Sequence, residues 1–320
     1  MTQPKALPAG GETQVRADPI GAVLVLVAAA FWGTSALFVK LVAIETGVSA
    51  LALAFWRDLT TFLVLVVSVG LLRPRWLRVT RSDLRWLAAM GVSLGIFHVI
   101  WNLGVMLNGA AVATVQQAAM PAIVAIAARL IWRESLTWTK VMAILLTFMG
   151  TVLVSGLEVL GQAQVSREGL LVGLAIPWLL AAWNLLGKKA RQNHNPFTIL
   201  TYAFGFAALV LAPFQFTTPQ PFPVSQTALL WFAGFIALST LGGFSIYTYA
   251  LGRLQASVAT ILAMSEIAFV AAYAFLWLDE RLNWSQLLGA ALVVGGVLLL
   301  SWPMRQKTSE VLETSEVLHR

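Results

Sequence analysis

The sequence contains no cysteine, which excludes disulfide bonds, thiolate metal ligands and cysteine nucleophiles. Charged residues are also scarce: they make up 11% of the 320 residues, whereas a soluble protein carries about 25%. A water-facing surface cannot be built from so few charges. The three histidines, His98, His194 and His319, are far apart and share no ligand spacing. We therefore expect neither a soluble domain nor a bound metal or other cofactor.

Apolar residues are abundant instead, at 59% of the chain with a mean hydropathy of +0.81. A membrane-crossing helix needs about 20 apolar residues. Such helices are favoured over strands, because an open sheet leaves backbone groups unpaired in lipid. These facts predict an all-α polytopic membrane protein with ten transmembrane helices, at about residues 20–42, 50–72, 86–107, 110–131, 139–157, 169–187, 196–216, 227–250, 257–278 and 285–303. Two polar tails, 1–19 and 304–320, flank them.

The basic residues predict the orientation of the chain. If the amino terminus is cytoplasmic, seventeen Lys and Arg lie on the inner side and two, Arg167 and Arg281, lie on the outer side. This bias follows the positive-inside rule and predicts that both termini are cytoplasmic. It also explains the net charge of +7 through contact with membrane lipid, so we expect no nucleic-acid partner.

An internal repeat is the most informative pattern. A shift of 146 residues places Val112-Ala113-Thr114 on Val258-Ala259-Thr260, and Glu134, Leu136 and Trp138 on Glu280, Leu282 and Trp284. The repeat predicts two units of five helices, 20–158 and 169–303. Because five is odd, the second unit enters the membrane from the opposite side. Inverted repeats of this kind are typical of carriers that open to each side in turn.

These residues carry a family resemblance. Two five-helix units, each with a Glu-x-Leu-x-Trp loop, resemble the EamA-type drug/metabolite transporter superfamily, as do Phe31-Trp32-Gly33, Lys40 and Arg57. Within it, the aromatic content is most similar to the bacterial aromatic amino acid exporters. The resemblance implies a bacterial inner-membrane protein that exports Phe, Tyr or Trp, and flat cationic xenobiotics as well. The second half departs from the first where Met120-Pro121 aligns with Glu266-Ile267.

Four charged residues within the apolar segments are candidates for the site or for gating. Glu266 lies about 13 Å deep, at 1.5 Å per residue; it is either a counter-ion for a substrate ammonium or a structural carboxyl. Arg57 and Asp58 are neighbours that point about 100° apart, so we expect each to find its partner on another helix or in a cavity. Arg57 is a candidate for binding a substrate carboxylate, and an interhelical ion pair is the alternative. Lys40 is expected to extend to the interface or to take part in gating.

A second group of candidates is polar or aromatic. His98, Trp101 and Asn102 share one helix face, and we expect them to line a cavity or to join helices. Pro177 allows its helix to bend. Tyr247 occupies the repeat position of Trp101. The further substrate-binding candidates are Gln116, Trp178 and Trp183.

The sequence favours a secondary transporter that exports aromatic or other bulky amino acids by alternating access through a central cavity. A drug or quaternary-cation exporter is the alternative, since Glu266 and the aromatic rings would serve it equally well. A membrane enzyme or a scaffold is the alternative from another class, but no converging nucleophile or metal site is visible, so we expect no enzyme. The expected partners are a small-molecule substrate and membrane lipid, and no oligomer is required.

Overall fold

The computed structural model describes residues 18–108, 110–161, 166–217, 219–222, 224–277 and 283–301. The first half of the chain forms helices α1 (Pro19–Gly33), α2 (Ser35–Thr46), α3 (Ala50–Leu72), η1 (Pro74–Leu77), α4 (Arg81–Asn108), α5 (Ala110–Gln117), α6 (Met120–Trp132), α7 (Trp138–Val154) and α8 (Leu157–Gly161). The second half forms α9 (Arg167–Ala190), α10 (Pro196–Thr217), α11 (Gln226–Gly234), the π-helix η2 (Phe235–Gly242), α12 (Gly243–Leu251), α13 (Ala256–Ala263), α14 (Ser265–Trp277) and α15 (Trp284–Ser301).

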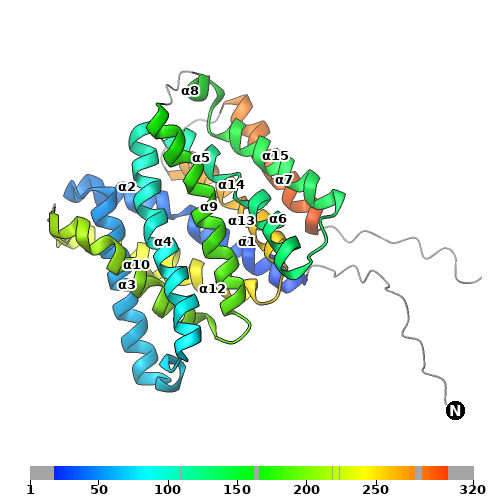
Figure 1. The fold of residues 1–320 in the computed structure, drawn as a ribbon. Helices are drawn as coiled ribbons and strands as arrows, with labels where there is room; N and C mark the ends of the chain where they lie inside the picture. Colours follow the sequence, from blue (N-terminus) through cyan, green and yellow to red (C-terminus); the bar gives the residue numbers. More distant parts are fainter. Residues whose placement is uncertain are drawn as a thin grey trace, which may run out of the picture.

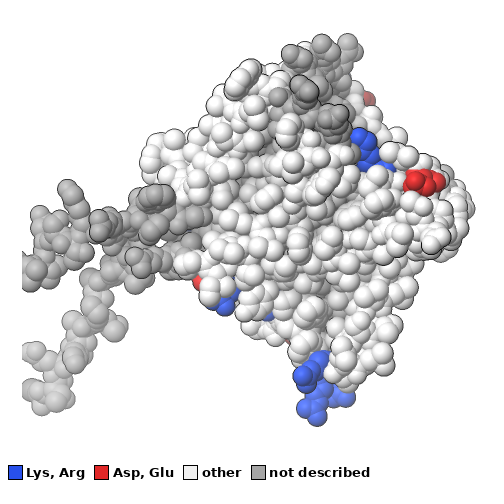
Figure 2. Space-filling model, turned by 180° about the vertical axis from the view of Figure 1, so that it is seen from behind, with Lys and Arg blue, Asp and Glu red and all other residues white. Residues whose placement is uncertain are grey.

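The predicted fold class is confirmed. The described residues form eight helical runs that are long and apolar enough to cross a membrane, together with two shorter apolar helices, α7 and α15. The face shown in Figure 2 is nearly free of charged side chains, and Lys and Arg gather at the tip where α3 ends and α4 begins. The protein is thus a multi-pass membrane protein. The predicted tails lie outside the described residues except for 18 and 19, as do Glu280 and Leu282 of the repeat.

Three predicted spans are broken helices. The first breaks at Thr34, whose hydroxyl donates to the carbonyl of Phe31 at 2.6 Å and so competes with the helical hydrogen bonds. The fourth breaks between α5 and α6, where Pro121 occupies the first turn of α6. The ninth breaks between α13 and α14 at Met264, the repeat position of Ala118. The fourth and ninth spans therefore break at equivalent points of the two halves.

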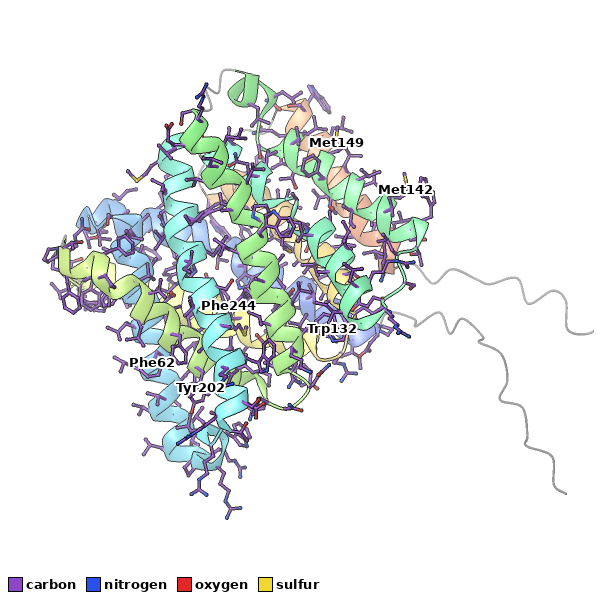
Figure 3. The ribbon with its side chains drawn as sticks, in the orientation of Figure 1. Phe62, Trp132, Met142, Met149, Tyr202 and Phe244 are labelled. Atoms are coloured by element: carbon purple, nitrogen blue, oxygen red, sulfur yellow. The ribbon has the colours of Figure 1, made fainter. Side chains whose placement is uncertain are left out.

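In each half, the third span packs against the first helix of the other half. The third span of the first half, α4, packs against α9, and the corresponding α12 packs against α1. Helix α10 covers α3 and α4, and α6 contacts α9 and α13. The largest buried core lies among α1, α4, α9, α10 and α12. Figure 3 shows Phe244 of α12 in the middle of this bundle.

Helices α7 and α15 pack side by side, and their contact is self-complementary (Figure 1). A Cβ atom added at Gly150 would lie 2.6 Å from the carbonyl oxygen of Gly289. A Cβ atom added at Gly296 would lie 3.0 Å from the carbonyl oxygen of Ala143. Gly150 and Ala143 are the repeat counterparts of Gly296 and Gly289. The same pair of contacts is therefore made twice, as in a two-fold interface.

The connections at 73–80, 133–137, 191–195 and 252–255 form one end of the bundle, here called the basic end. Hydrogen bonds and an ion pair tie this end together: the Asp18 carboxylate accepts from Arg253, Thr198 donates to the carbonyl of Trp76 at 2.8 Å, and Asp83 pairs with His194 at 3.3 Å. The described connecting residues 47–49, 155–161, 219–222 and 224–225 lie at the opposite end. Figure 1 shows α8 and α2 toward that end, away from the start of α1.

Candidate functional site

A buried charged cluster joins α3 to α4. The carboxylate of Asp58 is fully buried, and it accepts from Arg57 Nε at 2.9 Å and from His98 Nδ1 at 2.8 Å. Because Nδ1 donates to this carboxylate, Nε2 of the imidazole is left to accept, and the Arg57 Nη2 atom lies 2.5 Å from it. The side chain of Arg57 stays 14% exposed. The cluster thus fixes a guanidinium while leaving part of it accessible.

Arg57 and Asp58 each find a partner on another helix, as expected, and for both this partner is His98 of α4. The expectation that the two neighbours point apart is wrong for their side-chain ends, because the long Arg57 side chain turns back so that its Nε reaches the Asp58 carboxylate. Arg57 also lies over the ring of Phe235, at 5.7 Å from the ring centre. Phe235 begins the π-helix η2, a form that often marks functional sites.

The second half supplies a comparison for this cluster within the same molecule. The repeat positions of Arg57, Asp58 and His98 are occupied by Ala203, Phe204 and Phe244. The Phe204 and Phe244 rings meet edge to face at 5.2 Å, in the place where the first half joins Asp58 to His98. The fold therefore builds this helix contact from apolar rings alone, and the charges of the first half are an addition that packing does not require.

An aromatic cluster fills the centre of the bundle. Tyr247 is 1% exposed; its ring lies 4.8 Å from Trp32 and stacks on Trp183 at 5.9 Å. Its hydroxyl donates to Asn184 of α9. The side-chain Nε1 atoms of Trp32 and Trp183 are buried, and neither has a hydrogen-bond partner among the described residues. Trp183 and Tyr247 are thus brought together as closed core in this conformation.

Trp178 does not join this cluster. It is 64% exposed, whereas Trp183 is 3% exposed. Five residues along a helix rotate a side chain by about 140°, so the two rings leave α9 on different faces. Pro177 lies buried inside α9 next to Trp178. The expectation that both tryptophans contribute to one site is therefore not met in this conformation.

The remaining candidates of α4 and α5 lie near the opposite end. Trp101 is half-buried beside Phe97, with ring centres 6.1 Å apart, and Asn102 donates to the carbonyl of His98 at 2.7 Å within α4. Gln116 packs onto α9 at Gly173, where an added Cβ atom would lie 2.0 Å from its side-chain nitrogen. Gln116 thus uses the space that a glycine leaves.

Glu266 lies half-buried in the first turn of α14, just after the break in the ninth span. No hydrogen bond or ion pair joins its carboxylate to another residue within the described ranges. A carboxylate is favoured at a helix amino terminus by the helix dipole, which gives Glu266 structural support without a side-chain partner. Lys40 is exposed in α2.

The contacts of one motif residue were not predicted from the sequence. Glu134 was identified only as part of the repeat, yet its carboxylate is buried and accepts hydrogen bonds from the start of α13. Lys140, also buried, lies 3.9 Å from it. A glutamate in a loop followed by a lysine six residues later is the sequence pattern that could have indicated this ion pair.

A cavity of about 220 Å³ opens at the basic end between α4 and α9, and it is lined by Ser82, Asp83, Trp86, Leu87, Lys189, Ala190, Asn193 and His194. It contains neither Arg57 nor Glu266. Within the part of the chain that the structure describes, no three His, Asp or Glu side chains come together as a possible metal site.

A lipid-facing bundle of two inverted five-helix repeats defines an integral membrane protein of the carrier type. The family model described as EamA-like transporter family matches residues 19–156 and 167–302. The chain belongs to the EamA-like transporter family, as the resemblance predicted.

Several relatives extend over most of the chain. It is 25% identical to the "Uncharacterized inner membrane transporter YicL" of Salmonella typhimurium, over 90% of this chain and 97% of that protein. It is 26% identical to the "Uncharacterized transporter YwfM" of Bacillus subtilis, over 92% and 99%. It is 25% identical to the "Probable terminal-alkyne amino-acid exporter" of Streptantibioticus cattleyicolor, over 73% and 76%. A solved crystal structure has the same fold, with a TM-score of 0.72 at 19% identity, over 87% of this chain and 95% of that chain.

Proposed function

We propose that this transporter exports aromatic or other bulky amino acids by alternating access between its two halves, residues 20–158 and 169–303. The observation that carries the proposal is the buried cluster of Arg57, Asp58 and His98, whose repeat counterpart is an apolar pair. Burying charges costs free energy that packing alone does not return. A function that needs a fixed guanidinium explains why the first half has these buried charges.

Arg57 is the proposed partner of the substrate carboxylate. Asp58 and His98 hold Arg57 Nε and Nη2, and no hydrogen bond among the described residues occupies its Nη1. A carboxylate binds a guanidinium with charge-assisted hydrogen bonds, which are the strong ones. The relative from Streptantibioticus cattleyicolor, named for amino-acid export, supports a substrate with this group.

Glu266 is the proposed partner of the substrate ammonium, and aromatic side chains are the proposed walls for its side chain. The carboxylate of Glu266 has no partner within the described ranges, and its helix also carries Phe269 and Tyr273. The cavity between these groups forms when the halves move apart, because Trp32 of the first half packs against Tyr247 of the second half in the conformation described.

We place the protein in a bacterial inner membrane with the basic end in the cytoplasm. The exposed Arg73, Arg75 and Arg78 at this end support that orientation through the positive-inside rule. Both termini then lie in the cytoplasm. Transport needs no catalysis of bond cleavage, so we propose no enzymatic activity.

The test is counterflow in proteoliposomes with Thr, Leu, Phe and Trp, with and without a pH gradient. We expect Phe and Trp to move. Arg57→Met removes the charge-assisted bonds to the carboxylate, each of about 1.5–3 kcal/mol, and should slow Phe transport about 10- to 150-fold. Arg85→Met, an exposed arginine of α4 changed in the same way, is the matched control. Equal Phe transport by both variants would contradict the role of Arg57.

The second candidate is an exporter of flat or quaternary cations. It is favoured by Glu266, whose carboxylate has no partner within the described ranges and whose helix also carries Phe269 and Tyr273, since aromatic rings attract cations. Phenethylamine distinguishes the two, because it is Phe without the carboxylate. If the protein exports amino acids, it should transport Phe and not phenethylamine. The reverse result would establish the cation exporter.

A further inference from the structure

A carboxylate from the first half caps a helix of the second half at the basic end. Glu134 Oε1 accepts from the backbone N–H of Ala256 at 2.8 Å. Its Oε2 accepts from the backbone N–H of Ser257 at 3.3 Å and from the Ser257 hydroxyl at 2.5 Å. Lys140 Nζ donates to the same hydroxyl at 2.8 Å and to Gln255 Oε1 at 2.6 Å. We call Glu134, Lys140, Gln255 and Ser257 the Glu134 latch.

Helix α13 depends on this contact because it has no cap of its own. The first N–H groups of a helix lack partners within the helix, and a side chain at the N-cap position usually accepts from one of them. Gln255 occupies that position in α13, and its side chain makes no capping bond. The Glu134 carboxylate supplies the missing acceptor and also meets the positive end of the helix dipole. The amino terminus of α13 is thus complete only while the first half lies against it.

The backbone before Glu134 is shaped to present it. Helix α6 ends at Trp132, and the next residue, Arg133, has a φ of 57°, the one positive φ at a non-glycine residue among those described. The N–H of Glu134 donates to the carbonyl of Ala128 at 3.3 Å, which closes this turn. Such a turn is uncommon for a side chain larger than glycine. It directs Glu134 away from its own helix and across to α13.

The residues that reinforce the latch come from both halves and lie at the basic end. The repeat counterparts of Lys140 and Ser257 are Gln286 and Ala111, which carry neither the charge nor the hydroxyl. Gln286 makes different bonds: its Oε1 accepts from the N–H of Asn283 at 3.0 Å, and its Nε2 donates to the carbonyl of Val154, at the end of α7, at 3.3 Å. Glu280, the repeat counterpart of Glu134, lies outside the described residues, so among the described residues the buried lysine and serine of the latch are a feature of the basic end.

We propose that the Glu134 latch is the gate at the basic end: it holds the two halves together there, and the pathway opens to that side only when Glu134 leaves α13. This gate lies at the end of the molecule away from Gln116 and Trp101, and it acts whatever the substrate is. Its test therefore measures opening directly and uses no transported compound.

The absence of cysteine makes the test clean. Ala128 is fully buried in α6, in the same apolar cluster as Ala256, so Ala128→Cys reports access behind the latch and is called the latch reporter. Ala113 is fully buried in α5, so Ala113→Cys reports the opposite end and is called the far reporter. Each reporter, in full-length protein in nanodiscs, is labelled with a membrane-impermeant maleimide. The labelling rate follows the fraction of time for which the site is open.

Glu134→Gln keeps the shape of the side chain and removes the charge. In this variant the latch reporter should be labelled at least about tenfold faster than in the protein with Glu134, since one charge-assisted hydrogen bond contributes about 1.5–3 kcal/mol. Labelling at the far reporter should not rise. Glu168→Gln is the matched control, an exposed glutamate in the first turn of α9, and should change neither rate.

Ser257→Ala removes one hydrogen bond to the Glu134 carboxylate and keeps the carboxylate itself, so it decides the matter if Glu134→Gln does not fold. It should raise labelling at the latch reporter by a smaller factor and leave the far reporter unchanged. Unchanged labelling at the latch reporter in a folded variant would overturn the proposal. An equal rise at both reporters would also overturn it, because general loosening rather than a gate would then be measured.

Discussion

Replacing the buried charges of the first half by the apolar pair of the second half separates function from stability. Asp58→Ala alone should destabilise the protein strongly. The guanidinium of Arg57 and the imidazole of His98 lose their shared acceptor while they stay in a buried site. Breaking a buried ion pair in this way costs about 3–5 kcal/mol.

The triple variant Arg57→Ala, Asp58→Phe and His98→Phe copies the residues that stand at the equivalent positions of the second half. It removes all three polar partners together, so no buried charge is left unpaired. Fitting two larger rings costs about 1–3 kcal/mol, and their buried area offsets part of this cost. We therefore expect the triple variant to be more stable than Asp58→Ala by about 2 kcal/mol.

The assay is unfolding by denaturant in detergent, followed by the fluorescence of the 13 tryptophans, alongside Phe counterflow in proteoliposomes. The triple variant should fold and lose Phe transport. A triple variant as unstable as Asp58→Ala would refute the claim that the charges are unnecessary for packing. Retained Phe transport would refute their assignment to the substrate.

Three further predictions concern packing, a buried hydrogen bond and pH. Gly150→Ala should destabilise the protein by about 1–3 kcal/mol, because the added methyl group would lie 2.6 Å from a backbone carbonyl oxygen of α15; Gly295→Ala, where nothing lies within 4 Å, should not, as thermal unfolding will show. Tyr247→Phe leaves a buried amide oxygen of α9 without its donor and should cost about 1–3 kcal/mol in the same assay. The Arg253 guanidinium lowers the pKa of the Asp18 carboxyl, so this pair stabilises the fold above the ordinary pKa of aspartate. That contribution is lost as the pH falls through the lowered pKa. The stability difference between wild type and Arg253→Met should therefore vanish in acid, and acid-induced unfolding of the two proteins will measure it.

The number of spans and the repeat could be predicted because both depend on patterns along the chain. Apolar runs must match the membrane thickness, and the 146-residue shift is visible in residue types. The self-complementary contact of Gly150 and Gly296 in the structure agrees with that shift.

Contacts between helices were harder to predict, because they depend on how each helix is rotated about its axis. Trp178 and Trp183 belong to one helix and leave it on different faces. The pairing of Asp58 with His98 needs the packing of α3 on α4, which no local pattern gives. The cap that Glu134 places on α13 joins residues 122 positions apart.

The seam between α7 and α15 bears on how this chain arose. A single five-helix protein, inserted into the membrane in both orientations, would make the same glycine contacts with an upside-down copy of itself. Joining two such copies in one polypeptide removes the need for each surface to match itself. One half can then carry a buried aspartate and histidine where the other half has two phenylalanines, which no symmetric pair of identical chains can do.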